Sequence, residues 1–310
     1  MTAICAFIKR FGMESCCCKS LIIVPLLGAL LTMPVMVSAA EPTAVSHELD
    51  ITLGTAGRTA PLASNRNGGF ISELNMDAKY IVSPQMNKDL LFRCGAEWQR
   101  ISFPARQQSA EPDKLQQANA IVGFDSQLAE QWLMRFELQP GLYGDFSRFS
   151  WRSFDAPVNL GVAYLVDADL QWFFGLRVDI RSQYPVLPAV GVRWKYTDVW
   201  TLDLQLPNPR LLYDASDKFQ AFLGAGITAG TYMAGDHFGD DRGIPQLNHA
   251  TVDYTEVRLG PGLSWKARPN LTLDAEGGYV VYRTWNFFDQ HINLNSQPVP
   301  YLQLAVHSRF

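Results

Sequence analysis

The chain has 310 residues, 47% of them hydrophobic, and a net charge of −4 at pH 7. This mild acidity excludes the basic footprint that nucleic-acid binding requires, so nucleic acid is not expected as a partner. After the first forty residues, no apolar run approaches the roughly 20 residues that a membrane-spanning helix needs.

The first forty residues have the pattern of an export signal that is cleaved during secretion. Its basic part holds Lys9, Arg10 and Lys19. The apolar core runs from Leu21 to Leu31, and Val37-Ser-Ala-Ala40 supplies the small residues of a cleavage site. A retained membrane anchor is the alternative, which the short apolar core disfavours.

Cleavage there leaves residues 41–310 as a single predicted domain, and Met13 offers a second start for the signal. Cys5 and Cys16 to Cys18 are removed with the signal, which leaves Cys94 as the one cysteine of the mature chain. An intramolecular disulfide and a cysteine-based metal cluster are therefore excluded.

The mature chain alternates apolar and polar residues with a period of two, which predicts strands with different surroundings on their two faces. In the first half these runs cover residues 48–53, 73–82, 90–99, 118–124 and 132–142. In the second half they cover residues 158–166, 170–181, 190–196, 200–206, 211–213, 219–227, 257–265, 271–281 and 300–310.

This pattern predicts about fourteen strands, with short turns after the even ones and mostly longer loops after the odd ones. Two runs, 200–206 and 211–213, fall short of the roughly 9 to 11 residues that a spanning strand needs, so twelve strands is the alternative. Such an even, asymmetric series is typical of an all-β, transmembrane up-and-down antiparallel β-barrel. A soluble β-sandwich or barrel gives a similar alternation and is the competing interpretation.

The final run ends the chain on an aromatic residue. A membrane-insertion signal is predicted on its apolar face, at Leu302, Leu304, Val306 and Phe310. The terminal aromatic resembles the recognition signal of bacterial outer-membrane barrels, although Ser308 departs from that pattern. The resemblance implies the barrel-assembly machinery as a partner and the outer membrane of a Gram-negative-type envelope as the location.

One short motif, Leu206-Pro-Asn-Pro-Arg210 followed by Tyr213, stands in the weakest part of the strand series. With it, roughly residues 60–310 resemble a family of uncharacterised outer-membrane β-barrel proteins. The resemblance implies fold and location, and it carries no established substrate or catalytic residues.

Charged residues occupy the face opposite the apolar set, which is the barrel interior if the apolar set contacts lipid. The predicted lumen-lining charges are Arg93, Arg135, Arg177, Arg181, Arg193, Glu137, Asp274 and Glu276. Most of the arginines lie in the third to eighth strands, so opposite walls are expected to carry opposite signs and to orient hydrated solutes. The alternative is that these charges pair into ladders that fill the barrel.

Passive passage of small hydrophilic solutes is the leading functional interpretation, with the solute itself unspecified. A non-conducting structural or surface-interaction barrel is the main alternative, and uptake of hydrophobic compounds is less favoured because the interior is charged.

A hydrolase is the last alternative, because His237 lies among three carboxylates in the loop Gly235–Gly243. A cation site at Asp236, Asp240 and Asp241 is also conceivable. Without a nucleophile elbow, phosphate loop or zinc motif, the sequence predicts a non-enzyme with no cofactor and no metal. Outer-membrane lipid and lipopolysaccharide are expected partners, and Trp285-Asn-Phe-Phe288 is interpreted as part of an interfacial aromatic girdle.

Overall fold

A computed structural model describes residues 45–59, 71–103, 110–146 and 151–310. The predicted signal, residues 1–40, and the Gly/Asn-rich loop at 65–69 lie outside the described residues. Within the described ranges, no helix is long and apolar enough to cross a membrane.

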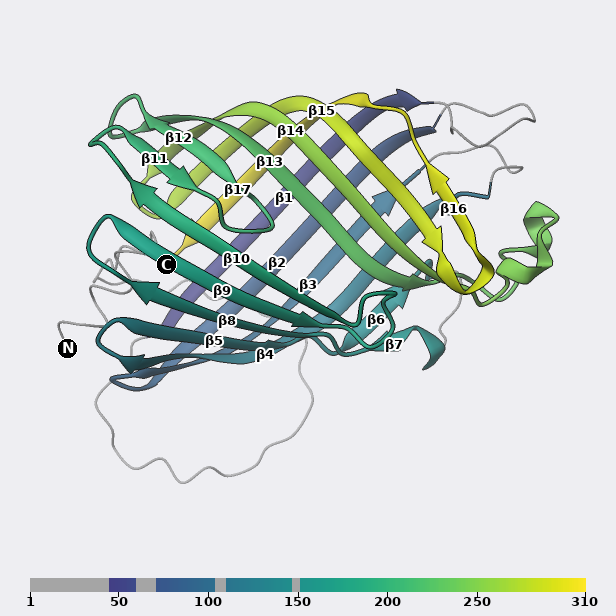
Figure 1. Ribbon diagram of the computed structural model, residues 1–310, viewed down its shortest axis with the longest axis horizontal. Helices are drawn as coiled ribbons and strands as arrows, with labels where there is room; N and C mark the ends of the chain where they lie inside the picture. The colour runs from purple at the N-terminus through teal and green to yellow at the C-terminus, as the bar shows by residue number, and fades with distance from the viewer. Residues whose placement is uncertain (1–44, 60–70, 104–109, 147–150) are drawn as a thin grey trace, which may run out of the picture.

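The described residues form one sheet of seventeen strands (Figure 1). The first eight are β1 (Val45–Thr59), β2 (Ile71–Asn87), β3 (Leu90–Ser102), β4 (Lys114–Ala129), β5 (Trp132–Leu138), β6 (Gly141–Gly144), β7 (Phe154–Asp155) and β8 (Val158–Leu165). The others are β9 (Leu170–Val178), β10 (Val186–Lys195), β11 (Trp200–Asp203), β12 (Arg210–Asp214), β13 (Phe219–Met233), β14 (Thr251–Arg268), β15 (Leu271–Phe287), β16 (Ile292–Asn295) and β17 (Val299–Arg309).

Apart from β5 and β6, β7 and β8, and β16 and β17, strands that are consecutive in sequence pair antiparallel, and β1 pairs with both β2 and β17, which closes the sheet. Three pairs of short strands each occupy one position in the barrel. β5 and β6 both pair with β4. β7 pairs with β6, and β8 pairs with β5. β16 and β17 both pair with β15. The molecule is therefore a closed, up-and-down antiparallel barrel of fourteen strands, which confirms the larger predicted count.

The period of two that predicted the strands also sorts their side chains between the two faces. On β1, Ile51 and Leu53 are exposed while Glu48 is buried, and on β3, Phe92 and Trp98 are exposed while Arg93 is buried. The outer face carries a band of exposed apolar side chains that includes Ile51, Leu53, Phe92, Trp98, Trp132, Trp172, Trp194, Trp265, Leu302 and Leu304. This arrangement, apolar outside and charged inside, is that of a barrel in lipid.

The two ends of the barrel differ in their connections. Short turns such as Lys88-Asp89 and Pro269-Asn270 lie at one end, which we call the turn end. Both ends of the described chain meet there, since His47 and Phe310 exchange two backbone hydrogen bonds of 2.6 and 3.0 Å. The long connections, including residues 234–250, lie at the opposite end, which we call the loop end (Figure 1).

One part of the predicted register is wrong. β15 continues to Phe287, where a loop was expected. Val281 has no partner in the register, because Val280 pairs with Arg258 and Tyr282 pairs with Val257 of β14. This bulge adds one residue to the strand and reverses which side chains face inward. Trp285 and Phe287 are consequently fully buried inside the barrel, so the girdle interpretation of these two residues is wrong.

Candidate functional site

The barrel interior is the candidate site, and its two sides differ. On the first, the guanidinium of Arg93 in β3 is only 2% exposed and lies among three carboxylates. It is 3.3 Å from Glu48 of β1, 3.5 Å from Asp125 of β4 and 3.6 Å from Glu137 of β5. One arginine thus joins four strands with no room for solvent around it.

A second arginine is sealed in the same way at β15. Arg283 is 0% exposed and lies 2.7 Å from Glu256 of β14, and it also donates to Glu73 of β2. Tyr254 donates to the same Glu256 at 2.8 Å. Because the bulge in β15 turns Arg283 inward, this group links β14 and β15 with β2. We call the interior around Arg93 and Arg283 the sealed side.

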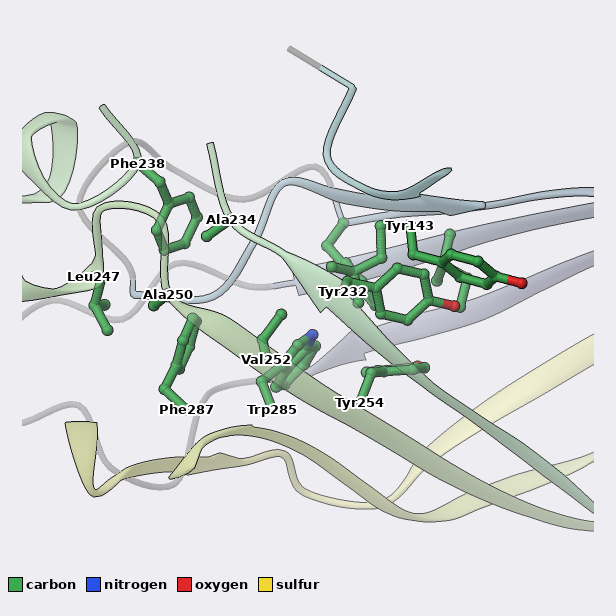
Figure 2. Packing of buried hydrophobic residues seen from close by; sticks show 13 residues of the cluster. Tyr143, Tyr232, Ala234, Phe238, Leu247, Ala250, Val252, Tyr254, Trp285 and Phe287 are labelled. Carbon is green, nitrogen blue, oxygen red and sulfur yellow. The ribbon is translucent and has the colours of Figure 1, made fainter. Parts of the chain in front are cut away.

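Near the loop end, the sealed side is filled by an aromatic cluster (Figure 2). Its members are Ile101, Phe103, Leu115, Tyr143, Tyr232, Ala234, Phe238, Leu247, Ala250, Val252, Tyr254, Trp285 and Phe287. The rings of Phe103, which follows β3, and Trp285 of β15 are 5.1 Å apart at nearly a right angle, although β17, β1 and β2 separate these strands in the wall. Apolar packing therefore closes this part of the barrel as a protein core would.

Contacts within and beside the cluster also join strands that are distant in the barrel. Met233 at the end of β13 pairs with Gly144 of β6, and Tyr232 donates to Gln99 of β3 at 3.4 Å. β13 and β6 are far apart around the ring of strands. These contacts narrow the barrel at the loop end. They separate the interior beside β8, β9 and β10 from the rest of the interior.

That compartment, which we call the hollow side, has very small inward residues. The register places Arg135 of β5 beside Gly161 of β8, Gly161 beside Gly175 of β9, and Gly175 beside Ala189 of β10. A methyl group placed on Gly161 would have no atom within 4 Å. We call Gly161, Gly175 and Ala189 the small-residue row.

A cavity of about 290 Å³ lies over the small-residue row. Leu133, Ala163 and Phe173 form its apolar lining, and Asp125, Arg135 and Gln205 supply polar groups. This volume is near the lower limit for ligand pockets, roughly 300 to 1,000 Å³. A small molecule therefore fits there, with an apolar surface beneath it and a guanidinium at one end.

The arginines of the hollow side are accessible to solvent even though they face inward. Arg135, Arg193 and Arg177 are 45%, 41% and 32% exposed, whereas their carboxylate partners are between 5% and 16% exposed. The partners are Asp125 at 2.7 Å, Asp203 at 3.0 Å and Asp179 at 3.7 Å. The interior space is therefore lined by hydrogen-bond donors, with the acceptors behind them.

The acidic residues of β15 are also paired. Asp274 lies 3.1 Å and Glu276 3.6 Å from Arg210 of β12, and the same guanidinium lies 4.1 Å from the centre of the Phe222 ring. Glu276 accepts a further hydrogen bond from Tyr301. Asp274 and Glu276 therefore pair with Arg210, an arginine outside the predicted set.

Seven of the eight predicted lumen charges lie on the inner face, divided between the two sides. Arg181 does not, because β9 ends at Val178 and Arg181 lies in the following connection, where it donates to the carbonyl of Arg152. Its placement on the strand was therefore wrong. The prediction also missed Asp125, Arg210 and Arg283. Continuing the alternation past Phe124 would have found Asp125, but the bulge hides Arg283 from any strict period of two.

The predicted insertion residues lie at the turn end and on the outer face of β17. Leu302, Leu304 and Phe310 are exposed, and the ring of Phe310 stacks on His47 with centroids 5.2 Å apart. Val306 lies on the same face, opposite Ile51 of β1. Their role as an assembly signal stays a prediction.

The histidine loop at the loop end shows no built catalytic site. His237 and Asp240 are 3.5 Å apart, and both are at least half exposed. Asp236 contacts His249 instead, at 3.1 Å, and Phe238 anchors the loop in the aromatic cluster. Among the described residues, no three His, Cys, Asp or Glu side chains are grouped as a metal site.

Comparison with known protein families matches residues 73–307 to a domain of unknown function, DUF6268. The chain belongs to this family. The matched region includes the motif Leu206–Arg210, which forms the connection between β11 and β12 and the first residue of β12. No curated protein matches the chain.

Several solved structures are similar to the chain over most of its length. The toluene transporter TbuX of Ralstonia pickettii has a TM-score of 0.39 and 9% identity, over 86% of this chain and 90% of that one. A deltaS2 mutant of the monoaromatic hydrocarbon channel TodX has a TM-score of 0.40 and 11% identity, over 87% and 91%. The NanC porin has a TM-score of 0.38 and 12% identity, over 84% and 98%.

Proposed function

We propose that this protein is an outer-membrane channel through which small hydrophilic solutes pass along the hollow side of the barrel. The observation that carries the proposal is the difference in arginine exposure. Arg135 and Arg193 are more than 40% exposed on the inner face, while Arg93 and Arg283 are sealed. Solvent reaches an inward guanidinium only where the interior is open.

The hollow side has the chemistry that a passage for polar solutes needs. Exposed guanidinium groups offer hydrogen bonds that replace those of water, and their charge acts strongly on nearby ions. The carboxylate behind each arginine limits that attraction, so a solute is bound weakly enough to leave. Residues without bulky side chains at the small-residue row keep the space open.

A non-conducting barrel is the second candidate, and the sealed side favours it. Two buried ion clusters and the aromatic cluster hold the strands together as the core of a soluble domain would. If the hollow side is closed at either end, the protein serves as a structural or surface-interaction barrel, with outer-membrane lipid and lipopolysaccharide as its neighbours.

Single-channel recording separates these candidates. The mature protein, refolded into lipid after removal of residues 1–40, is placed in a planar bilayer under a salt gradient. Discrete current steps with a measurable charge preference are expected. A silent bilayer, from protein shown to be folded by its heat-modifiable mobility on gels, would overturn the proposal.

A further inference from the structure

The barrel wall contains a gap between β10 and β13. β11 and β12, which separate these strands, have only four and five residues, and β10 pairs with β11 only through residues 193–195. On the other side, the pairing of β13 with β12 ends at Gly224. Figure 1 shows the short hairpin between the two long strands.

The family motif only partly fills this gap. Leu204 donates to Val192 at 2.8 Å, and the carbonyls of Pro207 and Pro209 accept from Ile227 and Ala225, each at 2.9 Å. Beyond these contacts, residues 186–191 and 228–232 form strand edges that no other described strand pairs with on that side. We call the space between these edges the lateral window.

The sequence of β10 is suited to an unpaired edge. The Val192 carbonyl points toward β11, so Val186, Pro188 and Val190 direct their backbone groups to the same side, into the lateral window. Proline has no N–H to donate, and within sheets it is confined to edges and bulges. A strand paired with β10 at Pro188 would lack one hydrogen bond, so Pro188 is suited to an unpaired edge.

Apolar side chains surround the lateral window on its outer face. Ile180, Tyr184, Val190 and Leu206 are each at least half exposed. At the loop end the window is bounded by Ser182 and Gln183, which donate to Asp253 of β14 at 3.1 and 2.8 Å. The window therefore has a fixed frame and an apolar rim, as a lipid-facing entrance requires.

The lateral window and the interior cavity share their residues. Ala189, Val190 and Gly191 form the β10 edge of the window and line the 290 Å³ cavity. Leu206, the first residue of the motif, and its neighbour Gln205 also line this cavity. Continuous lining connects the outer apolar rim with the small-residue row and with Arg135. An uncovered strand edge is costly in lipid because its polar backbone groups lack partners, so a bound molecule at this position is favoured.

We propose that the cavity binds a small amphipathic molecule that passes between the barrel interior and the membrane through the lateral window. Its apolar body lies on the small-residue row, and its hydrogen-bond acceptor, such as a carboxylate, reaches the exposed guanidinium of Arg135. The proposal rests on the proposed function for the open hollow side, and it adds a membrane route for amphipathic molecules.

Binding is tested with 4-(trifluoromethyl)benzoate, followed by fluorine NMR on the full mature protein in micelles. Saturable broadening is expected for the native protein. Gly161→Leu places a side chain in the cavity at a position where its Cβ has no atom within 4 Å, and it should abolish the broadening. Gly277→Leu makes the same change on the outer face of β15, away from the cavity lining, and should leave it unchanged. Broadening that persists in Gly161→Leu and in a second filling variant, Ala189→Leu, would overturn the site.

Lateral access is tested with a bimane fluorophore on a single cysteine, in a Cys94→Ala background. Nitroxide-labelled lipid chains should quench the label at Ala189→Cys much more than the label at Gly54→Cys, which lies on the inner face of the continuous wall. Equal quenching at the two positions would overturn the lateral route. Both tests are independent of ion conduction. A silent bilayer together with saturable binding would therefore overturn the channel proposal and support the binding site.

Discussion

Arg93 and Arg135 are the same residue type on adjoining parts of one inner wall, and both contact Asp125. Arg93 is 2% exposed, and Arg135 is 45% exposed. The difference comes from their neighbours. Both have a glycine beside them in the strand register, Gly123 for Arg93 and Gly161 for Arg135, but three carboxylates enclose Arg93 and one pairs with Arg135. The number of ion partners that reach each guanidinium therefore distinguishes the sealed arginine from the exposed one.

The sealed side should behave as a folded core. Replacing Arg283 with Met leaves Glu73 and Glu256 buried without their shared cation, and this loss typically costs about 3 to 5 kcal/mol of unfolding free energy. Urea unfolding in lipid vesicles, followed by tryptophan fluorescence, measures the change. Arg193→Met is the matched control and should cost at most about 1 kcal/mol. Equal losses for the two variants would remove the distinction between the sides.

The aromatic cluster is expected to hold the loop end closed on the sealed side. Phe238→Ala removes the ring that anchors residues 235–250, with an expected stability loss of about 3 kcal/mol. Single-channel current should rise, because the loop no longer packs over the interior. Phe219→Ala, at an exposed ring on the outer face, is the control and should leave the current unchanged. Unchanged current in Phe238→Ala would show that the cluster does not obstruct the passage.

On the hollow side, a charge change should alter conduction more than stability. Arg135→Glu reverses an exposed charge, and at contact distance in water one unit charge is worth about 1 kcal/mol. The reversal changes the charge by two units, or about 2 kcal/mol, so the permeability ratio should shift roughly thirtyfold toward cations. Reversal potentials under a salt gradient measure the shift, and Arg135→Gln should give about half of it on a free-energy scale. A ratio that stays at the native value would mean that ions do not pass Arg135.

The smallest effect is expected at the histidine loop. His237→Ala removes one member of an exposed ion pair, so stability should change by less than about 0.5 kcal/mol. Ester and phospholipid hydrolysis assays on the native protein and the variant should give equal rates. A hydrolytic activity lost in His237→Ala would restore the enzyme interpretation.

The sequence was sufficient for the fold where alternation is strict. Runs such as 48–53 and 90–99 predicted which side chains face inward, because the period of two fixes the faces of a strand. The bulge at Val281 escaped prediction because one added residue reverses the faces and leaves no local signature. For that reason Trp285 was assigned to the outer girdle, and Arg283 was missed as an inward charge.

The division of the interior could not be predicted from the sequence. Gly161 and Gly175 belong to different strands, and only the register places them side by side. Likewise, the pairing of Arg210 with Asp274 depends on a contact between residues 64 positions apart. The runs at 200–206 and 211–213 are visibly too short to span the membrane. The resulting gap in the wall becomes evident only when they are compared with the longer strands on either side.

The division between the sealed and hollow sides is tested most directly by the chemical accessibility of two inward positions. In a Cys94→Ala background, Gly161→Cys and Ala56→Cys are each exposed to a water-soluble methanethiosulfonate in proteoliposomes. Ala56 is 5% exposed on the sealed side, whereas Gly161 opens onto the cavity. The account predicts that Gly161→Cys reacts many times faster than Ala56→Cys. Equal rates at the two positions would contradict it.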